Sequence, residues 1–290
     1  MSLRAISNLR DVANDFDGFI LDLWGLVHDG ERPYPPSAET LRALKVAGKK
    51  TLLLSNAPRR AYALVEAMTK MGIGRELYGE VLSSGEATRE ALIKRDDPFF
   101  AALGRKVYHL GPERDRSVFE DTGLTIVSDL ADADFIVNTG PISLDEKVDD
   151  YLAVLEPAAR RALPMVCANP DFVVIRAGRP IVCAGAIAAR YTEMGGKVAL
   201  RGKPDPSIYH LAVEQLGVAD KARVAVVGDA LETDVKGARA SGLASIWCTG
   251  GIHAAALGVS YGVAADPVKA EALARHEGQM PTFMIPGFIW

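Results

Sequence analysis

The chain has 290 residues, of which 49% are hydrophobic and 24% are charged, a balance that is typical of a folded globular protein. Its formal net charge of −4 provides no overall positive field, so we expect no nucleic-acid partner. No apolar run is long enough to span a membrane, and the N-terminal segment lacks the apolar region of a signal peptide. The three scattered cysteines do not suggest a disulfide framework, and together these features predict a cytoplasmic protein with no membrane partner.

Short apolar runs alternate with amphipathic segments along the chain. The runs predict buried strands over residues 18–23, 49–55, 105–111, 133–140, 222–229 and 243–248. Two amphipathic segments, 37–48 and 58–72, predict helices that each end at a glycine, and Ser37 is a candidate N-cap of the first. This alternation predicts an α/β fold in which helices cover both faces of a Rossmann-like parallel sheet.

Polar side chains that can carry chemistry lie at the ends of three predicted strands. Asp22 ends the first run, Ser55 and Asn56 follow the second, and Asp229 ends the run that begins at residue 222. The carboxyl ends of parallel strands form the ligand-binding edge of an open α/β sheet. We therefore expect these side chains to lie close together.

The middle of the chain has its own alternation of strands and helices but no equivalent set of polar strand ends. This pattern predicts two domains. Residues 1–85 and 197–290 form one α/β domain, and residues 86–196 form a second α/β domain that is inserted into it.

Four segments contain the residue types that displacement of an oxygen from phosphorus requires. A carboxylate serves as nucleophile and metal ligand, a hydroxyl and an amide bind phosphate oxygens, and a lysine neutralises developing charge. A further acidic pair holds Mg²⁺ with hard oxygen ligands. In chain order the candidates are Asp22, Ser55, Asn56, Lys203, and the pair Asp229 and Asp234.

Each of these residues has an ordinary structural explanation when it is taken alone. An aspartate at a strand end often forms a turn, and Ser55 and Asn56 could cap the helix that follows. An isolated lysine is usually solvated, and Asp234 could be an acidic residue in a first helical turn. The four segments in this order favour the catalytic interpretation, in which Asp234 orients Lys203 or metal-bound water.

Other enzyme classes lack the spacing that their chemistry requires. Neither a complete phosphate-binding P-loop nor the G-x-S-x-G turn of serine hydrolases occurs in the sequence. The five histidines do not pair at zinc-ligand spacing, and no G-x-G-x-x-G follows the first predicted strand. The sequence therefore gives little support for a nucleotide-binding P-loop, a serine hydrolase, a zinc enzyme or a dinucleotide-binding protein.

The order and context of the four segments resemble the haloacid dehalogenase (HAD) superfamily of aspartate-nucleophile hydrolases. The resemblance covers nearly the whole chain and is most specific in GKPDPSIY and VGDALETD. It is closest to class IIA (NagD type), in which a large α/β cap is inserted between the second and third motifs. The resemblance implies a Mg²⁺-dependent phosphohydrolase that acts on a small phosphorylated metabolite through an aspartyl-phosphate on Asp22.

The resemblance also implies roles for residues outside the four segments' reactive side chains. In the phosphatase members, the backbone carbonyl two residues after the nucleophile binds Mg²⁺ beside the acidic ligands, and that residue is Trp24 here. The segment CANPDFV is similar to a cap segment that faces the substrate in the same branch. Asn169, Pro170 and Asp171 are therefore candidate substrate-side residues.

One position departs from the family pattern. Phosphatases of the family carry a second aspartate where this chain has Trp24, and its carboxyl protonates the leaving oxygen and later activates water. Indole N–H has no usable acidity and no basic lone pair, so Trp24 cannot do this work. General acid–base catalysis typically contributes about 10²–10⁴-fold to the rate.

Several consequences are open at this stage. In the first, the enzyme acts on substrates whose leaving group needs little protonation, such as acyl or aryl phosphates. In the second, His28 or Asp29 supplies the proton. In the third, the protein binds a phosphorylated metabolite with slow or no turnover. A hydrolase of C–P or C–halogen bonds has the least support, because those relatives use other helper residues. The apolar C-terminal segment MIPGFIW either packs on its own core or forms a homodimer interface.

Overall fold

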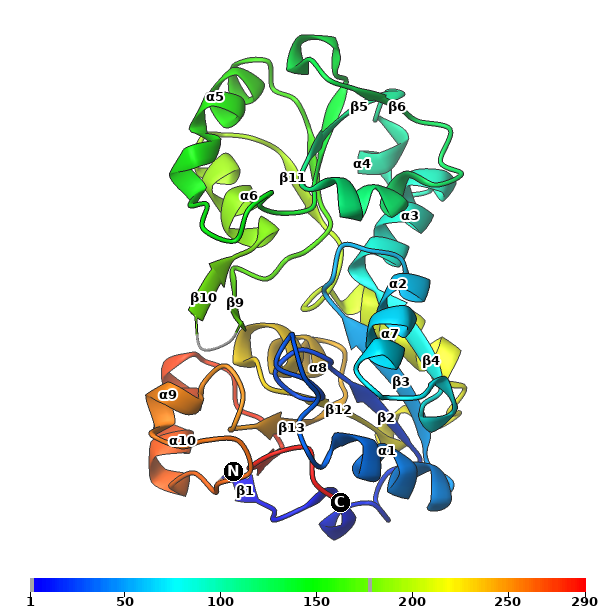
Figure 1. The fold of residues 1–290 in the computed structure, drawn as a ribbon, viewed down its shortest axis with the longest axis vertical. Coiled ribbons are helices and arrows are strands. Elements are labelled where there is room, and N and C mark those ends of the chain that lie inside the picture. Colours follow the sequence, from blue (N-terminus) through cyan, green and yellow to red (C-terminus); the bar gives the residue numbers. More distant parts are fainter. Residues whose placement is uncertain (1–2, 177–178) are drawn as a thin grey trace.

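The computed structural model describes residues 3–176 and 179–290. Two parallel β-sheets with helices on both faces form the two lobes seen in Figure 1, and both chain termini lie in the lower lobe. The predicted α/β fold, with a parallel-sheet core and an inserted α/β unit, is therefore confirmed. Within the described ranges, none of the helices combines the length and the apolar character that crossing a membrane requires.

The larger sheet is built from both ends of the chain. In the described residues it contains seven parallel strands in the order β1-β14-β13-β12-β2-β3-β4. Strands β2 and β12 lie side by side at its centre although the whole second lobe separates them in sequence. The strand bounds are β1 Arg4–Ala5, β2 Gly18–Leu21, β3 Lys50–Ser55, β4 Glu80–Ser83, β12 Val224–Gly228, β13 Ala244–Cys248 and β14 Phe283–Ile285.

Helices cover both faces of the larger sheet. Leu53 of β3 packs with α1 and α2 on one face, whereas Leu52 and Leu54 pack with α7 and α8 on the other. Successive side chains of a strand point to opposite faces, so the apolar run of β3 is buried on both sides. The helix bounds are α1 Ser37–Val46, α2 Ala61–Lys70, α7 Pro206–Leu216 and α8 Lys236–Ala240, with α9 Ala254–Leu257 and α10 Pro267–His276 near β13 and β14.

The smaller sheet belongs to the upper lobe of Figure 1. Its described strands are parallel and run in the order β11-β8-β7-β5-β6. Helices α5 and α6 pack on one face, and α3 and α4 pack on the other. The bounds are β5 Lys106–Leu110, β6 Thr125–Val127, β7 Phe135–Asn138, β8 Met165–Cys167, β11 Val198–Leu200, α3 Ser84–Lys94, α4 Pro98–Ala101, α5 Leu152–Arg160 and α6 Ala184–Glu193.

Two short strands lie outside both sheets. β9 (Val173–Arg176) and β10 (Arg179–Val182) pair antiparallel, with Arg176 opposite Arg179. We call these two strands the hairpin. Figure 1 shows it between the two lobes.

The predicted elements of the sequence occur in the structure, with one local correction. The six predicted strands correspond to β2, β3, β5, β7, β12 and β13, and the two predicted helices correspond to α1 and α2. Gly48 and Gly72 lie just beyond these helices with φ of 70° and 85°, as expected for residues that end a helix. Ser37 as N-cap is wrong, because Pro36 holds that position and the Ser37 hydroxyl donates to the Val27 carbonyl at 2.8 Å. The strands of the smaller sheet span residues 106–200, and the predicted boundaries of the inserted domain, 86–196, stay a prediction.

The C-terminal segment packs on the core of its own chain. Strand β14 pairs with both β13 and β1 in the larger sheet. Phe288 is fully buried among the apolar side chains of the larger lobe, and its carbonyl accepts a hydrogen bond from the Thr40 hydroxyl at 2.9 Å. The segment is therefore part of the fold.

We expect Phe288→Ala to lower the free energy of unfolding by about 3–5 kcal/mol, because truncating a buried phenylalanine leaves a cavity. Urea unfolding followed by circular dichroism measures the change. The control is Val46→Ala, at a side chain that is 84% exposed, where we expect a change within about 0.5 kcal/mol. Equal losses for the two variants would contradict the buried position of Phe288.

Candidate active site

The predicted reactive residues meet at the carboxyl edge of the larger sheet. Asp22 directly follows β2, Ser55 ends β3, and Asp229 directly follows β12. These three strands are neighbours in the order β12-β2-β3, so their carboxyl ends lie side by side. The structure thus brings together side chains that are up to 207 positions apart in sequence, as Asp22 and Asp229 are.

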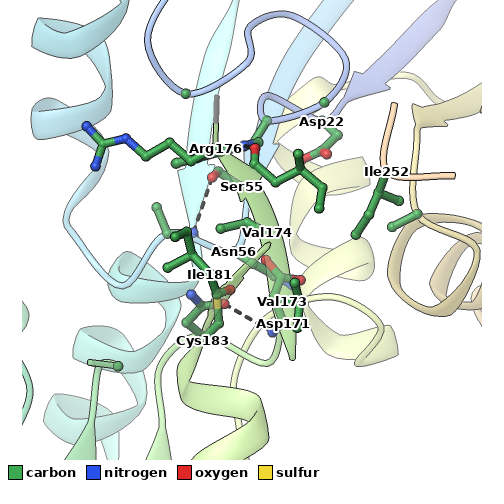
Figure 2. Close-up of a pocket in the computed structure, with 18 of the residues that line it drawn as sticks. Asp22, Ser55, Asn56, Asp171, Val173, Val174, Arg176, Ile181, Cys183 and Ile252 are labelled. Carbon is green, nitrogen blue, oxygen red and sulfur yellow. Dashed lines mark hydrogen bonds between the residues drawn. The ribbon is translucent and has the colours of Figure 1, made fainter. Parts of the chain in front are cut away.

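These side chains line a cavity of about 720 Å³, which Figure 2 shows in close-up. The larger lobe contributes Asp22, Ser55 and Lys203, and the smaller lobe contributes the predicted cap residues Asn169 and Asp171. The cavity therefore has walls from both lobes.

Pro170, the third predicted cap residue, has a different environment. It lies against two glycines. A side-chain carbon added at Gly185 would come within 2.2 Å of the Pro170 carbonyl oxygen, and one added at Gly202 would come within 2.9 Å of the Pro170 ring. Its contacts point to a packing role between the lobes. A direct contact with substrate stays a prediction.

Lys203 is the centre of the charged cluster. Its ammonium lies 2.5 Å from Asp22 Oδ1 and 2.7 Å from Asp234 Oδ1, and the side chain is 3% exposed. Burial alone would lower the pKa of Lys203, but the carboxylates of Asp22 and Asp234 outweigh it and raise the pKa well above the usual range. Lys203 is therefore a fixed positive charge beside Asp22.

Asn56 positions the backbone of Lys203. Its side-chain oxygen accepts from the Lys203 N–H at 2.8 Å, and its amide nitrogen donates to the Lys203 carbonyl at 3.0 Å and to Asp171 Oδ1 at 2.8 Å. Both amide hydrogens have partners in this arrangement. The contacts give the Asn56 side chain a positioning role, and its binding of phosphate stays a prediction.

Ser55 presents a hydroxyl to the same cavity. It is buried, and its Oγ accepts a hydrogen bond from the Ala57 N–H at 3.2 Å. The helix that follows has Arg60 as its N-cap, so Ser55 does not cap it. The hydroxyl hydrogen can therefore be donated to a phosphate oxygen.

The acidic residues fit a divalent cation. One carboxylate oxygen from each of Asp22, Asp229 and Asp234 lies within 4.8 Å of the others. Burial, and then the charges of Asp22 and Asp234, raise the pKa of Asp229 well above its usual range. The single ammonium of Lys203 does not balance three buried carboxylates, and hard oxygen donors suit Mg²⁺.

Asp229 and Asp234 are held rigidly by backbone groups. Asp229 Oδ2 accepts from the Ile252 N–H at 2.6 Å, and Asp234 Oδ2 accepts from the Ala230 N–H at 3.2 Å. Burial raises the pKa of Asp234 to about 6. Gly25 has φ of 90°, and a side-chain carbon there would come within 2.0 Å of Asp229 Oδ2, so the position requires glycine.

Trp24 turns its side chain toward the smaller lobe. Its indole N–H donates to the Ile175 carbonyl on β9 at 2.8 Å, and its ring lies edge-on to His28 with centroids 5.9 Å apart. Gly30 has φ of 93°, and a side-chain carbon there would come within 2.3 Å of the indole ring. Trp24 therefore occupies a fitted slot at the cavity wall.

His28 is poorly suited to replace the missing acid. It is 8% exposed, and its Nδ1 accepts a hydrogen bond from the Gly30 N–H at 3.0 Å. Burial lowers its pKa to about 4, so the ring is neutral near pH 7 and is a weak proton donor.

Asp29 lines the cavity but is also a poor acid. Its Oδ1 accepts backbone N–H groups of Glu31 at 2.8 Å and Arg32 at 2.7 Å. Burial would raise the pKa of Asp29, but these donors lower it below the ordinary value. Asp29 is therefore ionised near neutral pH and has no proton to give.

Part of the cavity was not predicted from the sequence. Tyr34 and Tyr261 stack with ring centroids 3.6 Å apart and line the cavity, as do Arg59 and the hairpin. Arg59 belongs to the segment SNAPRR, so its position next to a reactive segment was a usable signal. The β-branched residues of 173–182 were a signal for the hairpin. The pairing of Tyr34 with Tyr261 has no local signal.

Two family models match the chain. The model of haloacid dehalogenase-like hydrolases matches residues 19–125, and a model of HAD-hydrolase-like proteins matches residues 200–274. Both matched ranges include strands that end at the cavity.

Characterised proteins and solved structures are similar over most of the chain. Chronophin of Rattus norvegicus is 30% identical over 250 residues, which cover 84% of this chain and 80% of chronophin. A haloacid dehalogenase-like hydrolase of Brucella suis is 31% identical with a TM-score of 0.84, covering 98% of this chain and 100% of that one. A 4-nitrophenylphosphatase of Thermotoga maritima is 28% identical with a TM-score of 0.70, covering 96% of each chain.

The buried position of His28 predicts how stability depends on pH. The folded ring stays neutral down to pH about 4, whereas the ordinary pKa is 6.5, so between these values the unfolded state binds more protons. The contribution of His28 to the free energy of unfolding should therefore fall by about 2 kcal/mol as the pH drops from 7 to 5.

Urea unfolding of wild type and His28→Gln at pH 7 and pH 5 measures this contribution. The change in the free energy of unfolding between pH 7 and pH 5 should be less destabilising in His28→Gln than in wild type by about that amount, while His210→Gln, at an exposed side chain, should show the wild-type change. An identical change in wild type and His28→Gln would refute the lowered pKa of His28.

Proposed function

The chain belongs to the haloacid dehalogenase-like hydrolases of class IIA, and from this premise we propose that it is a phosphohydrolase whose nucleophile is Asp22. The observation that carries the proposal is the buried pair of Asp22 and Lys203, 2.5 Å apart at the carboxyl edge of the larger sheet. A solved relative is named as a 4-nitrophenylphosphatase, which supports phosphate-ester hydrolysis. The substrate class is a small phosphorylated metabolite.

The residues divide the reaction between them. Asp22 attacks phosphorus through a carboxylate oxygen, the bond from phosphorus to the leaving oxygen breaks, and an aspartyl-phosphate forms. Lys203 and the Ser55 hydroxyl stabilise the charge on the phosphate oxygens. Asp234 keeps the Lys203 ammonium in place through the 2.7 Å contact, and water then releases phosphate from Asp22.

We include Mg²⁺ in the proposal because the donor set fits it. Asp22, the Trp24 backbone carbonyl and Asp229 are the proposed ligands, and Asp234 supports the site through Lys203. When bound, the ion supplies positive charge that offsets the charge of the phosphate and of the buried carboxylates. We also propose that residues 86–196 act as a cap that supplies part of the substrate-binding wall, with Asn169 and Asp171 on it.

The proposed substrates have leaving groups that need little protonation. Trp24 has no acidic hydrogen, His28 is neutral, and Asp29 is ionised near pH 7, so these three residues do not provide a general acid. Aryl and acyl phosphates release stable anions without protonation. These esters are therefore the substrates that the site supports best.

The nucleophile is tested with Asp22→Asn. We expect turnover of 4-nitrophenyl phosphate with Mg²⁺ to fall by at least about 10³-fold, because an amide cannot attack phosphorus. Wild type should lose activity in EDTA and regain it when Mg²⁺ is restored. Release of 4-nitrophenolate is followed by absorbance.

The control for this experiment is Asp132→Asn, at an exposed aspartate in the smaller lobe, which should keep wild-type turnover. Equal rates in Asp22→Asn and wild type would reject the proposed nucleophile. Saturable binding of phosphate esters by wild type without phosphate release would instead assign the protein to the non-catalytic class.

The missing acid predicts a steep dependence on the leaving group. Wild type should turn over 4-nitrophenyl phosphate and acetyl phosphate about 10²–10⁴-fold faster than an alkyl phosphate such as glycerol phosphate. Steady-state kcat values for the three esters, with Mg²⁺ saturating, measure this dependence. Similar kcat values would mean that another residue protonates the leaving oxygen.

A further inference from the structure

The hairpin forms an apolar wall of the cavity that contains Asp22. Figure 2 shows Val173, Val174 and Ile181 around the same space as Ser55 and Asn56. The apolar side chains that the hairpin contributes to the lining are Val173, Val174, Ile175, Ile181 and Val182. Whatever occupies this cavity beside the phosphate site therefore meets hydrocarbon on the hairpin side.

The hairpin is not held by either sheet. Within the described residues, β9 and β10 pair only with each other, and both parallel sheets are complete without them. An isolated two-stranded hairpin is marginally stable in water. Its position over the cavity therefore depends on contacts with its surroundings.

Two contacts tie β9 to the segment that follows Asp22. The Trp24 indole N–H donates to the Ile175 carbonyl at 2.8 Å, and Arg176 Nε lies 3.4 Å from a carboxylate oxygen of Glu31. Arg176 and Glu31 are partly exposed, and exposed ion pairs typically contribute little. The indole hydrogen bond is therefore the better-defined of the two ties.

The indole is preorganised for this bond. Gly30 leaves room for the ring, since a side-chain carbon there would come within 2.3 Å of it, and His28 packs edge-on against it. A donor fixed in this way loses little conformational freedom when it binds the Ile175 carbonyl. An aspartate in place of Trp24 would have neither the N–H donor nor the ring that fills the slot.

We propose that Trp24 is a positioning residue that holds the hairpin over the active site through the Ile175 carbonyl and thereby makes the enzyme selective for phosphate esters with an apolar leaving group. The hairpin wall then contacts the leaving group, whereas the phosphate is bound at Asp22 and Lys203. The selectivity rests on the proposed phosphohydrolase function. The role of Trp24 in holding the hairpin does not.

The first test is Trp24→Phe, which keeps an aromatic ring in the slot and removes the N–H. We expect hydrogen exchange of the backbone amides in the hairpin to accelerate about threefold to tenfold, the range for loss of one hydrogen bond. We expect KM for 4-nitrophenyl phosphate to rise by a similar factor, while KM for acetyl phosphate changes less than about twofold.

Two further variants make the experiment specific. Glu31→Gln removes the ion pair between Glu31 and Arg176, and it should accelerate hydrogen exchange of the hairpin amides by a smaller factor than Trp24→Phe does. Tyr62→Phe is the matched control. The Tyr62 hydroxyl also makes an exposed hydrogen bond between distant segments, because it donates to Glu120 Oε1 at a distance of 2.8 Å, and this bond does not border the cavity. It should leave both hairpin exchange and KM at wild-type values.

The outcomes separate the two proposals. Wild-type hairpin exchange in Trp24→Phe would overturn the positioning role, whether or not the protein is active. Faster exchange with equal KM changes for 4-nitrophenyl phosphate and acetyl phosphate would overturn the selectivity. Loss of turnover in Asp22→Asn tests the nucleophile alone, so a failure of the hairpin experiment leaves that result intact.

Discussion

The buried ammonium of Lys203 between Asp22 and Asp234 is the interaction on which the site depends. A lysine that is 3% exposed is stable only when carboxylates compensate its charge, and these come from chain segments 181 and 31 positions away. Removing one partner of a buried pair typically costs about 3–5 kcal/mol, because the other charge is left without compensation. The same contacts that complete the fold of the larger lobe therefore place a positive charge beside the proposed nucleophile.

Asn56 links the position of Lys203 to the segments that connect the two lobes. Its amide holds the Lys203 backbone and reaches Asp171 in the smaller lobe. Where the chain passes between the lobes, the Ser84 hydroxyl donates to the Arg201 carbonyl at 2.7 Å and lies 3.3 Å from Asn56 Oδ1. The two connections between the lobes are thus joined to each other next to the proposed phosphate-binding residues. Movement of the smaller lobe relative to the larger one has to disturb hydrogen bonds that also position Lys203.

The sequence predicted what local patterns and sheet geometry determine. Asp22 and Asp229 could be placed together because each follows a buried parallel strand, and such strands end at one edge. Ser37 was misassigned because its hydroxyl donates to the Val27 carbonyl, a contact that helix propensity does not contain. The partner of Trp24 was also beyond prediction, since the Ile175 carbonyl lies 151 positions away on a hairpin that belongs to neither sheet.

Trp24 separates two functions that one aspartate combines in the phosphatases that this chain resembles. On the proposed mechanism the backbone carbonyl of Trp24 still contributes to the metal site, because every residue has a backbone carbonyl. Its side chain provides no acid–base catalysis and instead donates a hydrogen bond to the hairpin. The hairpin in this position lines the site with apolar side chains, and the lower local dielectric would strengthen the attraction between Lys203 and a bound phosphate. That gain acts on the charge around phosphorus and supplies no proton to the leaving oxygen. Tryptophan in place of the aspartate is therefore favourable only for esters whose leaving group departs as a stable anion. An apolar aryl group meets this requirement and also packs against the apolar side chains of the hairpin.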